Sequence, residues 1–455
     1  MIWSSTDREA GADPGRPSPA DAGTRWSRIG TAVLGALLGG LIGGLLVVAV
    51  TLVLKAGMDF GARQNLWYIV VVPVLGLAVT TLVLHVFGRG ATDGRPTTNP
   101  WRTFPPDTVR ADISKDVVDS AGQEERFPWR LAPIRLLAIV ATVASGAAMG
   151  TEAPAAYLGV AADVGLGDRS RWWHNLLRPA ALAGGAAGVA ALMAIPLVGT
   201  AFMLEIGRRR QAPLSAERVV AALIGGGVGW AINAALHLNL IRLVVPHEPP
   251  RNFTQALVTA LLIGALSGII SSLAGLAVYR AKNWQARPAV RLAIGAAATV
   301  ATVLVLARIT VPSAAIGPGG GAILWAENAG ALPSTLLAVC ILRAVATTAA
   351  VAAGGCGGVF IPFLAVGDIA GRVFAPGLGI GNDLAGAAGA AGGIAGGYRL
   401  PLTAVAMVFG VGGPPLATLT CLATVAVAYT AGVGAESVLE KLNALLQPAS
   451  QVPVH

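Results

Sequence analysis

The chain contains two copies of one sequence pattern, about 205 residues apart. The first copy is GTEAP (150–154) and the second is GVFIP (358–362), and in each a glycine follows five residues after the proline. Residues 183–197 also align without gaps with residues 388–402; the matched pairs are Gly184/Gly389, Ala186/Ala391, Gly188/Gly393, Ala190/Ala395, Pro196/Pro401 and Leu197/Leu402. Repeated membrane halves with helices broken near mid-bilayer are typical of transporters, whose sites lie where the repeats meet.

Hydropathy predicts an all-α, polytopic membrane protein. Only 12% of residues are charged and mean hydropathy is +0.68, whereas soluble chains carry about 25% charge. About 20 apolar residues cross a bilayer, and uncharged runs of that length recur at 31–54, 64–84, 179–204, 219–241, 253–279, 344–367 and 400–435. Backbone groups in lipid must be paired within the protein, so a helical bundle is expected.

The polar residues exclude several other classes of function. The net charge of +9 does not indicate nucleic acid, because the Lys and Arg residues sit at span ends and in loops, as in Arg208–Arg210, typical of cytoplasmic anchors. The three cysteines lack disulfide or metal spacing and the five histidines are scattered, so neither a metal nor another cofactor is expected. No Ser/His/Asp arrangement suggests an enzyme.

The span pattern predicts one transmembrane domain with two short tails. Residues 1–28 are expected to be a disordered tail, residues 29–435 the transmembrane domain, and residues 436–455 a short C-terminal tail. The repeat halves are placed at about 130–245 and 252–435, after a hydrophilic stretch at 88–130.

The second copy of the pattern has the composition of an anion site. Glycine lets the backbone approach a ligand closely, and proline suits a first helical turn. Free N–H groups at such a helix start, aided by the helix dipole, bind anions. A tight packing turn is the alternative for Gly357 to Pro362, but a matching GTEAP favours two helix starts that face one pocket.

Glu152 is the only charge between residues 136 and 162. A carboxylate in lipid costs about 2.5 kcal/mol or more, so it must be neutralised or satisfied. The amides that attract an anion would also attract this side chain. Glu152 is therefore predicted to compete with the anion as a gate; the alternative is a charge that only stabilises its own helix.

Several ordered motifs resemble those of the CLC family of chloride channels and proton-coupled chloride transporters, over roughly residues 30–435. GTEAP is similar to G-K/R-E-G-P, and GGVFIP to G-x-F-x-P. Residues 194–205 resemble N-A-P-L-x-G-x-x-F-x-x-E, and residues 399–403 resemble R-A-P-L-T. The resemblance implies an inverted-repeat homodimer in the cell membrane, with one anion pathway in each subunit.

The resemblance also implies the site residues. It assigns the gate to Glu152, and the anion-binding segments to Gly150, Thr151 and Ala153 on one side and Gly358, Val359, Phe360 and Ile361 on the other. The backbone N–H groups of Val359 and Phe360 would bind the anion. Arg343 would be structural and tie helices together.

This chain departs from the family pattern at several positions. Thr151 replaces a basic residue, and G-S-G-I-P is absent, with Thr92 or Ser114 as candidate replacements for its hydroxyl. The family's inner proton-transfer glutamate falls on Ile206, and its anion-coordinating tyrosine falls at or near Pro415.

Two further acids have open interpretations. Glu205, which precedes three arginines, is either part of a span-end ion pair or a candidate inner proton relay; Asp368 is interpreted as a solvated helix end. The predicted function is transport of chloride or a similar small monovalent anion, channel-like or weakly coupled to protons. A chloride–proton exchanger and a non-conducting membrane scaffold or sensor are the alternatives.

Overall fold

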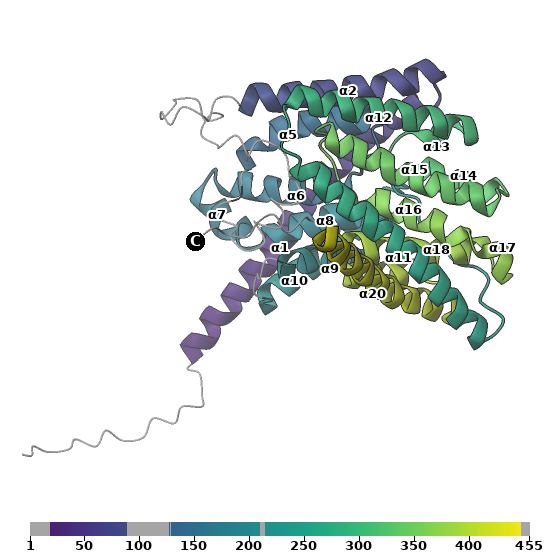
Figure 1. Cartoon of the computed structure of the whole chain (residues 1–455). Helices are drawn as coiled ribbons and strands as arrows, with labels where there is room; N and C mark the ends of the chain where they lie inside the picture. The colour runs from purple at the N-terminus through teal and green to yellow at the C-terminus, as the bar shows by residue number, and fades with distance from the viewer. Residues whose placement is uncertain (1–18, 89–126, 128, 210–213, 447–455) are drawn as a thin grey trace, which may run out of the picture.

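The computed structural model describes residues 19–88, 127, 129–209 and 214–446, which form a bundle of helices (Figure 1). Within these described residues, seven helices are long and apolar enough to cross a membrane, or eight if the bent pair α7 and α8 is one span. The all-α, polytopic fold is confirmed. The helices, with η4 a 3₁₀ turn and η5 and η6 π-helical turns, are α1 (Pro19–Ala62), α2 (Leu66–Gly88), η4 (Trp129–Leu131), α5 (Ala132–Ile139), η5 (Val140–Ala144), α6 (Glu152–Gly167), α7 (Arg171–Leu177), α8 (Ala181–Met193), α9 (Pro196–Arg209), α10 (Ala216–Ala235), α11 (Phe253–Asn283), α12 (Pro288–Ile309), α13 (Pro312–Ala315), α14 (Gly320–Asn328), α15 (Pro333–Ala352), α16 (Phe360–Arg372), α17 (Ala375–Leu378), α18 (Asn382–Gly393), η6 (Ile394–Tyr398), α19 (Pro401–Val411) and α20 (Pro415–Leu446).

Several uncharged runs are not single spans. The run 179–204 contains α8 and the first part of α9, and a left-handed residue, Ala194 (φ 56°), separates the two helices. The run 344–367 joins the end of α15 to the start of α16, and 400–435 contains α19 and most of α20. The spanning helix α12 has no matching run, because Arg291 and Arg308 lie within it.

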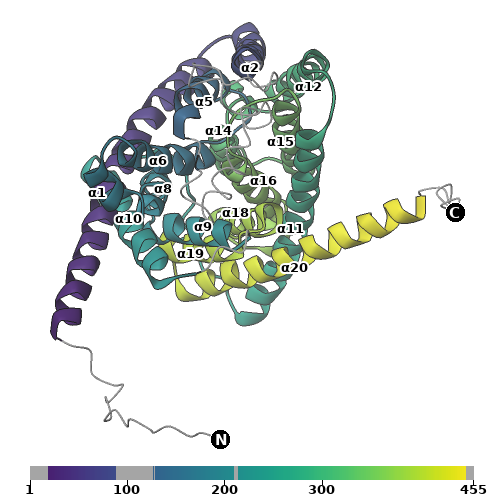
Figure 2. The ribbon, with the colours of Figure 1, turned by 90° about the vertical axis from the view of Figure 1, so that its left-hand side faces the viewer.

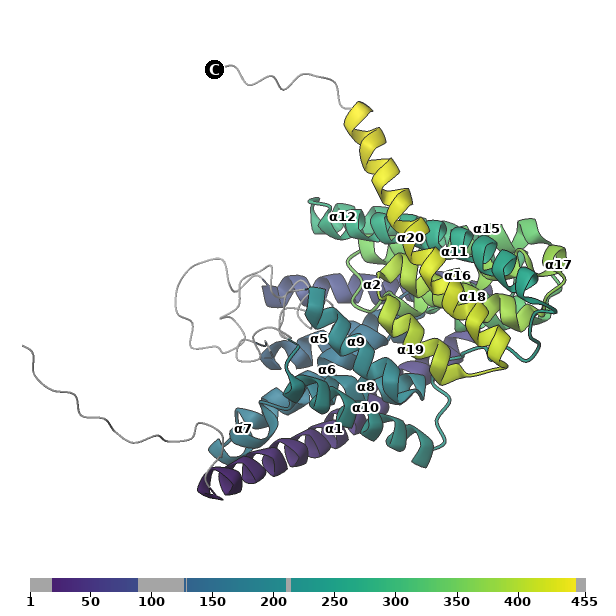
Figure 3. The same ribbon diagram turned by 90° about the horizontal axis from the view of Figure 1, so that it is seen from below.

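Both predicted tail boundaries fall inside helices. α1 begins at Pro19, and α20 continues to Leu446, beyond residue 435. Figure 3 shows the C-terminal part of α20 extending past the neighbouring helices. The stretch around Thr92 and Ser114 lies outside the described residues.

The internal repeat is visible in the backbone. Gly146 (φ 90°) and Gly354 (φ 92°) precede the two GxxxP segments. Ala194 (φ 56°) and Arg399 (φ 61°), 205 residues apart, are both left-handed and each follows the helical segment of its half. Left-handed backbone is uncommon for residues other than glycine, so its recurrence at matched positions supports the duplication.

One pair of matched glycines makes the same contact in each half. A Cβ on Gly159 would lie 2.1 Å from the carbonyl oxygen of Gly184, and a Cβ on Gly367 would lie 2.2 Å from that of Gly389. These contacts hold α6 against α8, and α16 against α18. Small residues allow such close approach of membrane helices.

Short buried helices occupy the interior, and long helices surround them. Every residue of α8 and of α16 is buried. In Figure 2, α16 and α18 lie inside a ring that includes α1, α2, α12, α11 and α20. α11 packs along α20, and α12 packs against α2 and α15. The fold therefore places the starts of the short helices in the protein interior.

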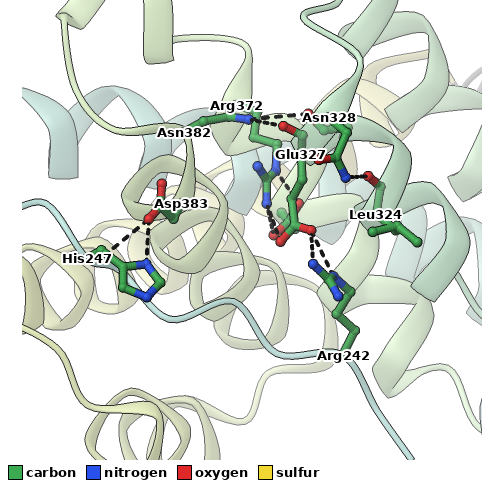
Figure 4. Close-up of polar contacts among 10 residues, drawn as sticks. Arg242, His247, Leu324, Glu327, Asn328, Arg372, Asn382 and Asp383 are labelled. Carbon is green, nitrogen blue, oxygen red and sulfur yellow. Dashed lines mark hydrogen bonds and ion pairs between the residues drawn. The ribbon is translucent and has the colours of Figure 1, made fainter.

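A network of charged groups fastens the segment between α10 and α11 to the second half (Figure 4). Arg242 donates from Nε to Glu327 of α14 at 2.8 Å, and Glu327 also lies 3.7 Å from the Nη2 atom of Arg372. Further along the segment, the His247 ring lies 2.8 Å from the Asp383 carboxylate. Burial opposes ionisation of Asp383, but the hydrogen bonds that this carboxylate makes with His247 and with backbone N–H groups together hold its pKa below its ordinary value.

Candidate functional site

The two GxxxP segments meet in an antiparallel pair. The N–H of Gly150 donates to the carbonyl of Gly358 at 2.7 Å, and the N–H of Gly358 donates back to Gly150 at 2.8 Å. The next residues, Thr151 (φ −104°, ψ −9°) and Val359 (φ −122°, ψ 2°), have nearly the same conformation and are the N-caps of α6 and α16. The two equivalent helix starts therefore meet directly, and their role as one anion pocket stays a prediction.

Glu152 lies across this junction. Its carboxylate is fully buried, and Oε1 accepts the Phe360 N–H of α16 at 2.5 Å. Oε2 has no hydrogen-bond partner among the described residues. A helix N-terminus attracts a negative group through its free N–H and its dipole. The first half of the chain therefore supplies an acid that occupies the anion-binding end of a helix in the second half.

The glycines of the junction leave room for this carboxylate. A Cβ on Gly358 would lie 2.1 Å from Oε1 of Glu152, and a Cβ on Gly150 would lie 2.2 Å from Oε2. No side chain larger than hydrogen fits at either position while Glu152 stays in place. The other predicted anion-site residues, Thr151, Ala153, Val359 and Ile361, lie in the first turns or caps of the same two helices.

Two aromatic rings, those of Phe202 and Tyr398, pack against the ring of Phe360. The ring centroids of Phe202 and Phe360 are 5.9 Å apart, those of Phe360 and Tyr398 are 5.9 Å apart, and those of Phe202 and Tyr398 are 6.3 Å apart. We call Phe202, Phe360 and Tyr398 the aromatic triangle. Tyr398 was missed in the sequence, although it is the aromatic residue directly before the R-L-P-L-T segment.

Glu205 caps the start of a helix. Its carboxylate accepts the N–H groups of Leu402 at 3.0 Å and Thr403 at 2.9 Å, and the Thr403 hydroxyl at 2.8 Å. These groups belong to the first turn of α19, whose free N–H groups need such partners. Ile206, the next residue, is buried. Pro415 begins α20, four residues after α19 ends.

The interpretation of Asp368 as a solvated helix end is wrong. Asp368 is fully buried, and its two oxygens accept from Nε (2.6 Å) and Nη2 (3.1 Å) of Arg372, one turn further along α16. Apolar periodicity could not show this, because an Asp–Arg pair four residues apart is also common on exposed helices. Asp368 also lines a small cavity between α16, α18, α19 and α20.

Asp163 is a further buried acid, and the sequence analysis did not single it out. Its Oδ2 atom accepts the Gly184 N–H at 3.1 Å, in the first turn of α8. Glu152, Asp163 and Glu205 thus each bind the N-terminal turn of another helix. The predicted structural role of Arg343 is confirmed, since its guanidinium donates to the carbonyls of Ala315 and Gly317.

The described residues contain no group of three or more His, Cys, Asp or Glu side chains arranged to hold a metal ion. The site consists instead of backbone N–H groups, one carboxylate and an aromatic surround. Such an arrangement can bind a small anion in competition with its own acid.

The fold and this junction define a class of membrane proteins with two inverted halves that present helix N-termini to a buried acidic side chain. The model of the voltage gated chloride channel family matches residues 101–432. The chain therefore belongs to this family, which is one of multi-pass membrane proteins.

The comparisons give relatives at moderate similarity. The H(+)/Cl(-) exchange transporter ClcA of Vibrio vulnificus is 27% identical over 258 residues, and that of Vibrio cholerae is 26% identical over 253 residues. Each alignment covers 54% of this chain and 53% of the relative, so the chain spans about half the length of the curated relatives it matches.

Solved structures share the fold over most of the chain. A slow cyanobacterial Cl-/H+ antiporter has a TM-score of 0.66 at 20% identity, covering 92% of this chain and 99% of its own. A CLC-type fluoride/proton antiporter has a TM-score of 0.65 at 20% identity, covering 91% and 96%. A eukaryotic CLC transporter has a TM-score of 0.64 at 15% identity, covering 90% and 74%.

Proposed function

We propose that this protein transports chloride or a similar small monovalent anion through a pathway that Glu152 gates. The observation that carries the proposal is the bond from the Phe360 N–H to the Glu152 carboxylate at the junction of the two repeats. A group that binds a carboxylate oxygen there can bind a free anion in its place. The exchange of one for the other is the gating step.

The chemistry of the site suits passage as well as binding. Conduction requires binding that is favourable enough for an ion to enter and weak enough for it to leave. Neutral N–H groups at a helix start meet this need better than a buried cation would. Protonation of Glu152 removes its negative charge, so the carboxyl competes less strongly and the anion gains access.

We propose further that proton coupling is weak or absent. A coupled exchanger needs a titratable group on the far side of the anion site, and Ile206 offers none there. Glu205, one residue earlier, accepts hydrogen bonds from three groups at the start of α19, so its carboxylate is already engaged in capping that helix. The alternative of a chloride–proton exchanger is supported by the names of the relatives, and a non-conducting scaffold is the second alternative.

Proteoliposomes test the three alternatives together. The full-length protein should dissipate a chloride gradient faster than empty vesicles; equal rates would favour the scaffold. With the membrane potential clamped, an external pH electrode should record no uphill proton movement. Proton movement at a fixed ratio to chloride would establish an exchanger, and its loss in Glu205→Gln would make Glu205 the relay.

The homodimer implied by the family resemblance belongs to the same proposal. One pathway lies within each subunit, because both GxxxP segments and the aromatic triangle come from one chain. Concatenated subunits with one Glu152→Gln copy should therefore show half of the variant's change in flux. A full change or no change would mean that the subunits do not act independently.

A further inference from the structure

Thr142, in the π-helical turn η5 of the first half, makes a buried contact with the second half. Its Oγ1 atom accepts the backbone N–H of Cys356 at 3.0 Å, and both residues are fully buried. Cys356 lies two residues before Gly358, in the loop that leads from α15 into α16. This bond therefore anchors the loop to the first half, in addition to the pair that Gly358 makes with Gly150.

The Thr142 hydroxyl belongs to a chain of hydrogen bonds that run in one direction. A hydroxyl has one hydrogen to donate. Because the Cys356 N–H can only donate, the hydrogen of Thr142 remains for the Oγ1 atom of Thr80 on α2, 2.8 Å away. Thr80 is also fully buried, and its Oγ1 atom lies 2.9 Å from the carbonyl oxygen of Gly76 and 3.1 Å from that of Ala138. The chain thus fixes the Thr142 hydroxyl as the acceptor for the loop.

The internal repeat separates the packing role of Thr142 from its polar role. The register that matches Gly146 with Gly354 places Ala350, which is also fully buried, opposite Thr142. The same backbone bonds close both turns. The N–H groups of Gly146 and Gly354 each donate to the carbonyl three residues earlier at 3.0 Å. In each half the next N–H donates to the carbonyl of Thr142 or Ala350, at 3.2 and 2.9 Å. A methyl group therefore suffices to build this turn, and the hydroxyl is an addition made in one half only.

We propose that Thr142 is a positioning residue for the anion site, and that its hydroxyl holds the loop before α16 so that the Phe360 N–H meets the Glu152 carboxylate or the anion. This inference rests on the proposed function and adds a residue to the same site. A buried N–H without an acceptor costs free energy, so without the hydroxyl the loop must shift until Cys356 finds another partner. Phe360 follows four residues later, and hydrogen bonds weaken steeply when they are misaligned.

The test compares two substitutions of Thr142 by calorimetric titration with chloride in detergent. The parent is the full-length Glu152→Ala protein, which has no carboxylate at the junction. Thr142→Val keeps the shape of the side chain and removes the hydroxyl, and it should bind chloride about threefold to tenfold more weakly than the parent, the range expected for one hydrogen bond. Thr142→Ser keeps the hydroxyl and should bind chloride as the parent does. Unchanged binding in the Val variant, or a loss in the Ser variant alone, would overturn the inference in favour of packing.

A matched control and a second measurement keep the result decisive. Thr299→Val on α12 removes another buried hydroxyl, which donates only within its own helix at 2.8 Å, and should bind chloride as the parent does. An equal loss in this control would refute a specific role for Thr142. In an otherwise wild-type protein, amide hydrogen exchange of the peptide 355–361 should be faster with Thr142→Val and unchanged with Thr142→Ser. Unchanged exchange in the Val variant would refute the anchoring. Exchange does not depend on chloride, so faster exchange without any chloride flux would reject transport and leave the positioning of the loop standing.

Discussion

Substitution of Gly358 by alanine tests whether Glu152 and the anion share one position. The added Cβ would lie 2.1 Å from Oε1 and 2.6 Å from the carboxyl carbon of Glu152. Ordinary contact begins at 3.4 Å, so Oε1 would have to retreat by about 1.3 Å and would lose its bond to the Phe360 N–H. Gly358 has no positive φ, so alanine brings no backbone strain there.

The consequence for an anion follows from the same distance. If an anion binds where Oε1 now lies, the methyl group excludes it as well. A hydrogen bond to a charged group contributes about 1.5–3 kcal/mol, so chloride should bind about tenfold to a hundredfold more weakly. The substitution should therefore reduce chloride flux, although it also displaces the gate.

The double variant isolates this effect. In a Glu152→Ala background no carboxylate remains, and Gly358→Ala should still weaken chloride binding by calorimetry and slow efflux from vesicles. Gly227→Ala on α10 is the matched control, because its Cβ would have nothing within 4 Å. If Gly358→Ala alone speeds efflux and is neutral in the Glu152→Ala background, the anion does not use the Oε1 position.

Three other changes test the surrounding structure. Glu205→Gln weakens the cap of α19 and should reduce stability by about 1–2 kcal/mol, seen as a lower midpoint of thermal unfolding, with no change in proton movement; altered coupling would contradict the capping role. Arg372→Met leaves Asp368 buried without its partner and should cost about 3–5 kcal/mol, whereas the apolar double variant Asp368→Leu/Arg372→Met should recover most of that stability; equal losses in both would contradict the ion-pair argument. Burial raises the pKa of Asp168, but the hydrogen bonds from Arg178 and Trp129 and the positive charge of Arg178 act together to leave the pKa below its ordinary value. The contribution of Asp168 is therefore present above about pH 4 and lost as the pH falls through the folded-state pKa, so the unfolding midpoints of wild type and Asp168→Asn should differ at pH 7 and converge in acid; a constant difference would contradict this assignment.

The sequence predicted the core of the site because the two halves of the chain keep the same pattern of residues at matched positions. Gly150 and Gly358 begin the two GxxxP segments in the sequence, and in the structure their backbones hydrogen-bond to each other. Glu152 stood out because a lone charge in an apolar stretch needs a partner. Its partner, the Phe360 N–H, was within the segment predicted to bind anions.

The remaining features depended on contacts that local patterns do not record. Asp368 would be solvated if its face of α16 were exposed, but every residue of α16 is buried by neighbouring helices, so Asp368 pairs with Arg372 instead. Glu205 accepts its hydrogen bonds from α19, almost 200 residues later in the chain, and no local pattern indicates that contact. The family resemblance places the anion-coordinating tyrosine at or near Pro415, so it does not point to Tyr398. The residue spacing also does not show that a ring just before α19 contacts Phe360.

The central claim is that Glu152 competes with the transported anion, and its most direct test is the pH dependence of chloride efflux in wild type and Glu152→Gln. Vesicles are compared across a range of roughly pH 4.5 to 7.5, whose acid end approaches the ordinary carboxyl pKa. Wild-type efflux should rise as the pH falls, because protonation removes the competing charge. Glu152→Gln should be faster than wild type at pH 7.5 and should show no pH dependence. Identical rates and pH profiles for the two proteins would contradict the claim and leave Glu152 a residue that only stabilises the start of α16.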